Sequence, residues 1–247
     1  MGSIRDLKIK IFADGADIGG IKELYKNPSI KGFTTNPTLM RKAGIADYEA
    51  FARQLVAAIP DRPISFEVFA DDFEEMIAQG RVIATWGHNV NVKIPVTTTK
   101  GAFTGPVVQK LAQAGVVVNV TAIMTAEQVQ RVAECLAPNV PAIISVFAGR
   151  VADTGRDPVP VMRNSLRALA DRPQAELLWA SPRELLNIFQ ADEIGCHIIT
   201  VSHDVLAKLS SIGKDLDEYS LDTVKMFHRD AIAAGFRISV PALQSAS

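Results

Sequence analysis

Residues 90–123 read VNVKIPVTTTKGAFTGPVVQKLAQAGVVVNVTAI, and this stretch decides the fold. In Val90–Ile94 apolar and polar residues alternate with a period of two, which is typical of a β-strand. Gly105–Ala114 has the apolar spacing of an amphipathic helix, and Gly115 follows it as a C-terminal cap. A second apolar strand, Val116–Ile123, comes next. The order strand, helix, strand predicts two parallel strands joined by a helix.

The same alternation continues along the whole chain. Eight runs have strand character: Lys8–Asp14, Gly32–Asn36, Ile64–Phe69, Val90–Ile94, Val116–Ile123, Ala142–Phe147, Glu176–Ala180 and His197–Val201. Helical patterns accompany them: Ile18–Lys26, Asp47–Ile59, Phe73–Trp86, Gly105–Ala114, Ala126–Leu136, Val159–Ala170, Pro182–Phe189 and Asp204–Ser211. Eight such repeats in about 250 residues predict an α/β fold, a closed (β/α)8 or TIM barrel.

The boundaries of the elements support one domain over residues 1–247. Asp71 and Asp72 before one helix and Asp204 before another fit N-caps, and Gly195 fits a helix end like Gly115. The tail, residues 214–247, adds a helix over Leu221–Ala234, which we expect to pack on the barrel or on a neighbouring subunit.

An open doubly wound sheet is the alternative fold. The glycine-rich segment 15–20 after the first strand matches neither a dinucleotide fingerprint nor a phosphate loop. No linker or charge block divides the chain, so the barrel is preferred.

Composition narrows the function classes. The 247 residues are 48% hydrophobic and 21% charged, with a formal net charge of -1, which indicates a globular protein without nucleic-acid or anionic-membrane partners. Cys135 and Cys196 lack paired spacing, and the histidines lack metal-ligand spacing. We therefore expect no metal and no cofactor. Without a signal segment in residues 1–6 or an apolar run of roughly 20 residues, a cytoplasmic location is expected.

Polar side chains stand near the ends of the predicted strands. In a barrel of this type, chemistry lies at the carboxyl ends of the strands. The polar residues read there are Asp14, Thr34, Asn36, Glu67, Asn91, Lys93, Asn119, Thr121, Ser145, Ser181 and Arg183. Unpaired polar groups inside apolar strands carry a desolvation cost, and convergence on one site explains them together.

Lys93 is the residue with the clearest chemistry. A lysine directed into a barrel loses hydration, which favours the neutral amine that can attack a sugar carbonyl. The alternative is a lysine that extends to solvent or pairs with a carboxylate.

Several segments resemble the transaldolase family, which includes the fructose-6-phosphate aldolases. They keep the family's order and cover nearly the whole chain: TTNPTL at 34–39, VKIP at 92–95, NVT at 119–121, SVFAGR at 145–150 and ASPR at 180–183. The resemblance implies a barrel enzyme that transfers a dihydroxyacetone unit from a ketose phosphate, such as sedoheptulose 7-phosphate or fructose 6-phosphate, to an aldose phosphate. It implies sugar-phosphate ligands and a homo-oligomer.

The resemblance also assigns roles to residues. Lys93 would form a Schiff base with the C2 carbonyl, and Asp14 would take the C4 hydroxyl proton as the C3–C4 bond breaks. Glu67 and Thr121 would handle a catalytic water. The substrate-binding set would be Thr34, Asn36, Asn119, Ser145 and Phe147, with Arg150, Ser181 and Arg183 at the phosphate.

Each role has a structural alternative. Asp14 could cap the helix that starts near Ile18, and Asn36 could serve only the turn before a proline. Glu67 could form a silent buried pair with Lys93.

The arginines have alternatives too. Arg150 could pair with Asp153 or Asp157 in its own loop, and Arg183 could be a solvated residue in the first turn of a helix.

Three positions depart from the family's pattern. Gly15 stands where a threonine commonly follows the aspartate, Pro182 where an aromatic is common, and His203 in a stretch that is often proline-rich. Pro182 adjoins the phosphate site, so a sulfonated or other anionic sugar is an alternative substrate.

The resemblance leaves a choice of reaction. Phe147 and Glu67 match the transaldolase branch, where the aldolase branch tends to have tyrosine and glutamine. A phenol could relay a proton to the enamine and promote release, whereas a phenyl ring cannot. We therefore favour transaldolase, with aldolase cleavage as the alternative. A sugar-phosphate-binding protein without turnover is a third hypothesis.

Overall fold

The computed structural model describes residues 7–239 of the chain. The chain divides into two compact units, of which the larger ends at Leu209 and the smaller begins at Ser210.

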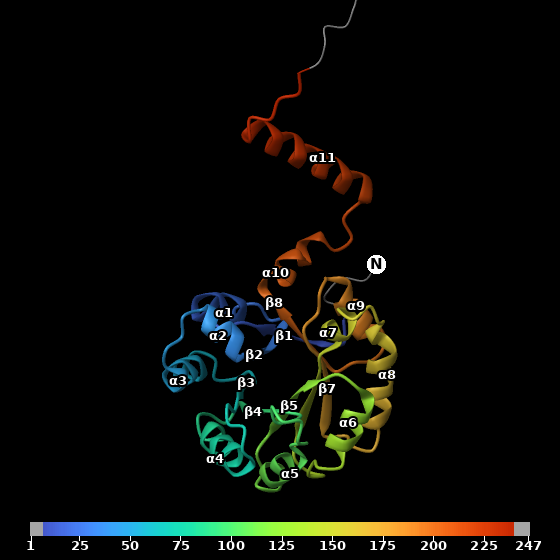
Figure 1. Cartoon of the computed structure of the whole chain (residues 1–247). Helices are drawn as coiled ribbons and strands as arrows, with labels where there is room; N and C mark the ends of the chain where they lie inside the picture. Colours follow the sequence, from blue (N-terminus) through green and yellow to red (C-terminus); the bar gives the residue numbers. More distant parts are fainter. Residues whose placement is uncertain (1–6, 240–247) are drawn as a thin grey trace, which may run out of the picture. The chain divides into compact units, whose positions relative to one another are not determined.

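The larger unit is a closed barrel of eight parallel strands in sequence order (Figure 1). The strands are β1 Lys10–Asp14, β2 Ile30–Thr34, β3 Ile64–Glu67, β4 Val90–Pro95, β5 Val118–Ile123, β6 Ala142–Val146, β7 Ala175–Trp179 and β8 Ile198–Ser202. The last strand pairs with the first, Asp14 opposite Ser202, so the sheet has no free edge. The predicted (β/α)8 barrel is confirmed.

Helices surround this barrel (Figure 1). They are α1 Ile18–Tyr25, α2 Pro37–Lys42, α3 Tyr48–Ala58, α4 Phe73–Ala84, α5 Gly105–Gln113, α6 Ala126–Ala133, α7 Ala148–Ala152, α8 Pro158–Ala168, α9 Leu186–Glu193 and α10 His203–Leu206, followed by the 3-10 helix η2 Ala207–Ser211. The two short helices α2 and α7 were not predicted, because six and five residues are too few to show a helical period.

The helix ends follow the expected chemistry with two corrections. Asp72 caps α4, whereas Asp71 accepts hydrogen bonds from Thr99 instead. The second correction is at α10, which begins one residue earlier than predicted, so Asp204 lies in its first turn and Ser202 is at the N-cap.

The predicted helix-ending glycines are confirmed by their backbone angles. Gly115 and Gly195 have φ values of 79° and 78°, a left-handed conformation that glycine adopts without strain.

The barrel interior is filled by a small apolar cluster that separates its two ends. The cluster is Phe12, Ile143, Leu178, Ala180 and Ile198, with Phe147 packed against it. A Cβ atom at Gly32 would lie 2.6 Å from the Phe12 ring, so the absence of a side chain there makes room for this ring. The larger apolar core lies between the strands and the surrounding helices.

The smaller unit contains α11, Leu216–Ala233. The helix begins earlier than predicted because Asp215 accepts hydrogen bonds from the backbone of Asp217 and Glu218. None of its residues is buried. Its packing on the barrel or on another subunit stays a prediction. Within residues 7–239, no helix is both long and apolar enough to cross a membrane.

Candidate active site

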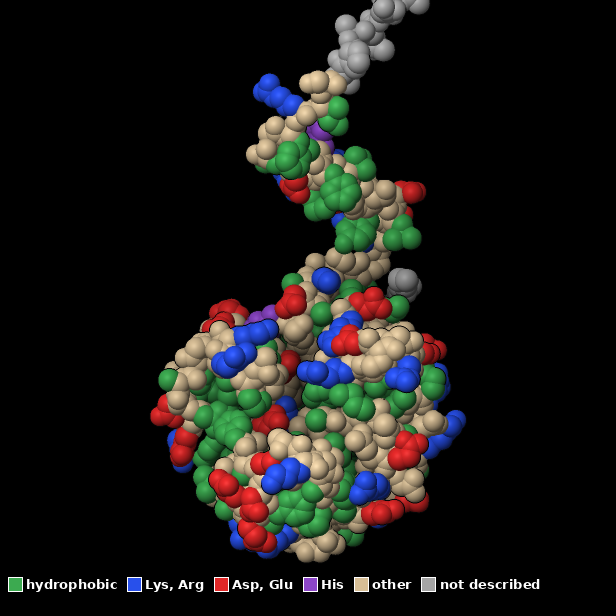
Figure 2. Space-filling model, viewed as in Figure 1, with side chains coloured by type: hydrophobic (Ala, Val, Ile, Leu, Met, Phe, Trp, Pro, Cys, Tyr) green, Lys and Arg blue, Asp and Glu red, His purple; other side chains and the backbone are tan. Residues whose placement is uncertain are grey.

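A cavity of about 580 Å³ opens at the carboxyl ends of the barrel strands, and Figure 2 shows side chains of both charges in the hollow at the centre of this face. All twelve predicted site residues line this one cavity: Asp14, Thr34, Asn36, Glu67, Lys93, Asn119, Thr121, Ser145, Phe147, Arg150, Ser181 and Arg183. The structure thus brings the predicted set together, while the individual roles stay predictions.

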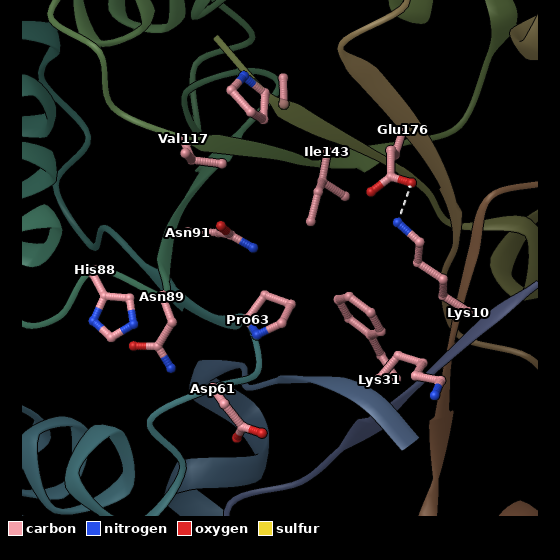
Figure 3. Close-up of a pocket in the computed structure, with 13 residues that line it drawn as sticks. Lys10, Lys31, Asp61, Pro63, His88, Asn89, Asn91, Val117, Ile143 and Glu176 are labelled. Atoms are coloured by element: carbon pink, nitrogen blue, oxygen red, sulfur yellow. Dashed lines mark hydrogen bonds and ion pairs between the residues drawn. The ribbon is translucent and has the colours of Figure 1, made fainter. Parts of the chain in front are cut away.

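Asn91 lies elsewhere, contrary to the expectation that it joins the strand-end cluster. It lines a second cavity, of about 570 Å³, at the amino ends of the strands, where Lys10 and Glu176 form an ion pair (Figure 3). Asn91 and Lys93 are two apart on β4 and share its inner face, but the apolar cluster inside the barrel lies between the two ends.

Lys93 is held deep in the cavity, with 6% of its surface exposed. Its Nζ donates a hydrogen bond to the carbonyl oxygen of Thr35 at 2.9 Å and lies 3.3 Å from Glu67 Oε2. Glu67 on β3 stands opposite Lys93 on β4 in the strand register. The pair expected as a structural alternative therefore exists, and it also places a carboxylate beside the amine, where proton transfer is needed.

Asp14 ends β1 on the same side of the cavity. Thr34 Oγ1 donates to its Oδ1 at 2.8 Å, and Asn36 Nδ2 lies 3.4 Å from its Oδ2. Burial raises the pKa of Asp14 above its ordinary value, and the neighbouring Lys93 charge partly opposes this effect. A carboxyl with a raised pKa suits proton exchange near neutral pH.

The helix-capping alternative for Asp14 is wrong. Asp17 caps α1 through hydrogen bonds from the backbone of Gly19 and Gly20. Asn36 serves the turn, since its Oδ1 accepts from Leu39 N at 3.0 Å as the N-cap of α2, and its amide faces Asp14. Its substrate-binding role stays a prediction.

A chain of hydrogen bonds fixes the polar residues of β5 and β6. Ser145 Oγ donates to Asn119 Oδ1 at 2.7 Å, and Asn119 Nδ2 donates to Ser65 Oγ at 3.0 Å. Thr121 differs, because its buried Oγ1 has no hydrogen-bond partner among the described residues. Such a hydroxyl next to a cavity is free to bind a water or a substrate oxygen.

The arginines at the rim are arranged differently from the structural alternatives considered for them. Arg183, not Arg150, pairs with Asp153: its Nε donates to Asp153 Oδ1 at 2.8 Å, and its Nη2 also contacts the carboxylate. Its Nη1 donates to Ser181 Oγ at 2.9 Å. The hydrogen bonds from Arg183 lower the pKa of Asp153.

Arg150 forms no ion pair within 4.0 Å with a carboxylate of the described residues. It is exposed, and its Cζ lies 5.8 Å from the centre of the Phe147 ring. Its charge acts on Asp153 only at longer range, where it contributes to the lowered pKa of that carboxyl.

The backbone around Ser181 is unusual. Ser181 has a φ of 60°, in the left-handed region that non-glycine residues rarely adopt. A Cβ atom on Gly149 would lie 1.6 Å from the Ser181 carbonyl oxygen, so only glycine permits this approach of α7 to the chain after β7.

The sequence analysis did not identify two further residues at the site, Tyr48 and Lys42. The Tyr48 hydroxyl accepts from Glu67 N at 2.7 Å and donates to Glu67 O at 3.0 Å, which fixes the backbone of Glu67 from α3. Burial raises the pKa of Tyr48, so it stays protonated. Lys42 of α2 adds a fourth basic side chain to the cavity lining, beside Lys93, Arg150 and Arg183. Both residues lie on helices, so the strand pattern used to find the site residues could not indicate them.

In the part of the chain that the structure describes, no three His, Cys, Asp or Glu side chains lie close enough together to hold a metal ion.

Comparison with known proteins places this site in a family. The family model described as transaldolase/fructose-6-phosphate aldolase matches residues 11–238. The chain belongs to this family. A probable transaldolase of Dehalococcoides mccartyi is 35% identical over 202 residues, which cover 81% of this chain and 90% of that protein. Probable transaldolase 2 of Listeria monocytogenes is 33% identical over 204 residues, covering 82% and 89%.

Solved structures support the fold alone. A putative phosphonomutase from Burkholderia cenocepacia superposes with a TM-score of 0.57 at 11% identity, covering 85% of this chain and 94% of that one. An HpcH/HpaI aldolase/citrate lyase family protein from the same organism gives a TM-score of 0.56 at 15% identity, covering 90% and 97%.

Proposed function

We propose that this member of the family is a transaldolase, which moves a dihydroxyacetone unit from a ketose phosphate to an aldose phosphate through a Schiff base on Lys93. The observation that carries the proposal is the buried Lys93 amine, 3.3 Å from Glu67 Oε2, in the same cavity as Asp14. The family match supports it, as do relatives named probable transaldolase.

The reaction begins at the amine. The free amine of Lys93 attacks the C2 carbonyl of the ketose to give a carbinolamine, which takes up one proton, by way of Glu67, and loses one water to give a protonated imine. Glu67 is within reach of Nζ, and the unpartnered Thr121 hydroxyl can hold the departing water. The same two groups return a water when the imine is hydrolysed.

Carbon–carbon cleavage follows at Asp14. Its carboxylate takes the proton of the C4 hydroxyl, the C3–C4 bond breaks to leave an aldose, and the bonding electrons move into the imine to give an enamine. Asn119 and Ser145, which are joined by a 2.7 Å hydrogen bond, would hold the hydroxyls of the three-carbon unit. Addition of an acceptor aldose reverses these steps, with Asp14 returning its proton.

The rim of the cavity supports an anionic substrate. Arg150 forms no ion pair with a carboxylate of the described residues, Arg183 is oriented by Asp153, and the Ser181 hydroxyl accepts a hydrogen bond from Arg183. Guanidinium groups suit the oxygens of a phosphate, and the same chemistry would accept a sulfonate.

Transfer is preferred over simple cleavage because Phe147 lines the cavity with a ring that has no proton to give. Without such a donor the enamine waits for an acceptor aldehyde. Because sugar phosphates are charged and cross a bilayer only at high cost, we propose that the enzyme works in the cytoplasm.

Borohydride reduction in the presence of fructose 6-phosphate tests the proposal. The wild type should acquire a stable adduct on Lys93, and Lys93→Ala should fold, form no adduct and lose several orders of magnitude in rate. Lys100→Ala is the matched control, since Lys100 is exposed on the loop after β4. An adduct located on Lys100, or none at all, would defeat the assignment; a protein that only binds sugar phosphates forms none.

We also propose that the protein is a homo-oligomer. Leu216, Val224 and Phe227 on α11 are 79%, 60% and 63% exposed within the described residues, which is unusual for large apolar side chains on one helix. Light scattering of the full chain should give more than the 26.7 kDa of one copy. A strictly monomeric mass would rule this out.

A further inference from the structure

Glu67 stands at a point where the barrel sheet is incomplete. The pairing of β2 with β3 ends at Thr34 and Ser65. β2 itself stops at Thr34, and Asn36 already caps α2. On its other side β3 continues beside β4, with Glu67 opposite Lys93. The β2 edge of Glu67 therefore lacks a strand partner within the described residues.

The Tyr48 hydroxyl occupies this open edge. In a parallel pair only every second residue of a strand directs its backbone groups to a given neighbour. Val68 N donates to Lys93 O at 3.1 Å, so the backbone groups of Glu67 face the β2 side. Tyr48 supplies both missing partners there, because its hydroxyl accepts from Glu67 N at 2.7 Å and donates to Glu67 O at 3.0 Å. One side chain of α3 thus replaces the absent strand.

Tyr48 is itself held in place by packing. Asp47 caps α3, and Tyr48 is the first residue of this helix. Its ring makes edge contacts with Phe66, Phe69 and Trp86, at centroid distances of 6.2, 4.5 and 5.6 Å. Aromatic pairs favour such edge-to-face arrangements at these distances. The position of the hydroxyl is therefore fixed by the surrounding rings as well as by its two hydrogen bonds.

The side chain of the residue that Tyr48 holds reaches the proposed Schiff-base lysine. Glu67 Oε2 lies 3.3 Å from Lys93 Nζ, and Nζ also donates to Thr35 O at 2.9 Å. A shift of the Glu67 backbone would move this carboxylate relative to an amine that a second contact keeps in place. Proton transfer needs a separation of about 2.6–3.2 Å, or one bridging water. The separation leaves little room for displacement.

We propose that Tyr48 is a positioning residue for Glu67, and that its hydroxyl holds the Glu67 carboxylate beside Lys93 Nζ for the proton transfers of imine formation and hydrolysis. This inference rests on the proposed transaldolase function. In these steps Glu67 gives a proton to the carbinolamine hydroxyl, which leaves as water, and takes a proton back when water adds to the imine. Carbon–carbon cleavage uses Asp14, whose carboxyl is held by other residues.

The test measures how fast the imine forms. Each protein is mixed with dihydroxyacetone, which forms an imine but has no C3–C4 bond to break, and borohydride added at successive times traps the adduct on Lys93. Tyr48→Phe keeps the ring and removes the hydroxyl. Tyr25→Phe is the matched control, because the Tyr25 hydroxyl donates to Asp61 Oδ1 at 2.6 Å and Asp61 lines the cavity at the opposite end of the barrel.

Tyr48→Phe should slow the accumulation of the adduct by about 10- to 100-fold, the loss expected when a proton-transfer group is displaced by up to about 1 Å. The final amount of adduct should equal that of the wild type, because formation and hydrolysis of the imine slow together. The Tyr25 control should keep the wild-type rate. A hydroxyl that serves stability alone would lower the final amount through loss of folded protein and leave the rate unchanged.

A second comparison asks whether Tyr48 acts through Glu67. Glu67→Gln removes the proton-transfer group, so adding Tyr48→Phe to it should slow the rate further by less than about twofold, whereas independent effects would multiply. The role of Tyr48 alone is overturned by a Tyr48→Phe rate equal to the control, by a lower final amount at an unchanged rate, or by multiplied losses in the double variant. An unchanged rate in Glu67→Gln also overturns it. No adduct in the wild type overturns the proposed function.

Discussion

Thr121→Val tests the catalytic role proposed for the Thr121 hydroxyl, which makes no hydrogen bond with the described residues. Thr121 is 2% exposed, and its Oγ1 has no partner among the described residues. Valine keeps the β-branched shape that suits β5. Because no protein hydrogen bond is lost, the free energy of unfolding should stay the same or rise by up to about 1 kcal/mol, part of the roughly 1–3 kcal/mol cost of a buried unpaired group.

Thr35→Val is the matched control. Thr35 is fully buried just after β2, does not line the cavity, and donates from Oγ1 to Ser65 O at 2.9 Å. Its replacement should lower the free energy of unfolding by about 1 kcal/mol. For a chain of this length that corresponds to a fall in Tm of about 2–4 °C.

The two variants should differ in activity in the opposite order to their stability. Thr121→Val removes a group that holds the water of imine formation and hydrolysis, and we expect turnover to fall by about 10²-fold or more. Thr35→Val should turn over like the wild type. Thermal unfolding and coupled transfer kinetics measure the two properties. A loss of stability in Thr121→Val equal to that of the control, or normal turnover, would refute the reasoning.

Three further outcomes are expected. Arg150→Ala should weaken the use of phosphorylated donors by about 10- to 150-fold, and Arg183→Ala should do likewise; equal losses with an unphosphorylated ketose in steady-state assays would remove the anion role. Phe147→Tyr should increase the free dihydroxyacetone released from fructose 6-phosphate relative to transfer, by up to about 10²-fold, and rapid acceptor-free cleavage by the wild type would make the enzyme an aldolase. Asp14→Asn should be inactive yet more stable than the wild type at neutral pH. Burial raises the pKa of Asp14 in the folded protein above the ordinary 3.8. The contribution of Asp14 to the free energy of unfolding is therefore fully present below pH 3.8 and is lost as the pH rises through the folded-state pKa. Urea unfolding should show that Asp14→Asn is more stable than the wild type at pH 7 and about as stable at pH 4.

The strand positions of the site could be predicted because the side-chain period of a strand is two. Glu67, Lys93 and Thr121 each stand near the carboxyl end of an apolar run, and a barrel brings those ends together. The same rule gave a wrong prediction for Asn91, because the period of two shows which face of a strand a residue is on but not how far along the strand it lies. An inward residue at the second position of β4 falls at the opposite end of the barrel.

The rim contacts could not be predicted from strand patterns. Arg183 and Asp153 are 30 residues apart and meet only because α7 and the chain after β7 approach closely at Gly149. Tyr48 reaches Glu67 from a helix. Such contacts depend on the directions in which side chains of different elements point, and the periodicity of the sequence gives no information on these directions.

Left-handed backbone at non-glycine residues concentrates in one of the large cavities. Ala122 and Ser181 are the non-glycine residues with positive φ among the described residues, and both line the cavity at the carboxyl ends of the strands. A left-handed non-glycine residue reduces stability, and packing alone gives no reason to gather both of them in one place. The equally large cavity at the amino ends is lined by neither left-handed residue. The distribution of strain therefore points to the Lys93 cavity as the reactive end of the barrel, by an argument independent of the family match.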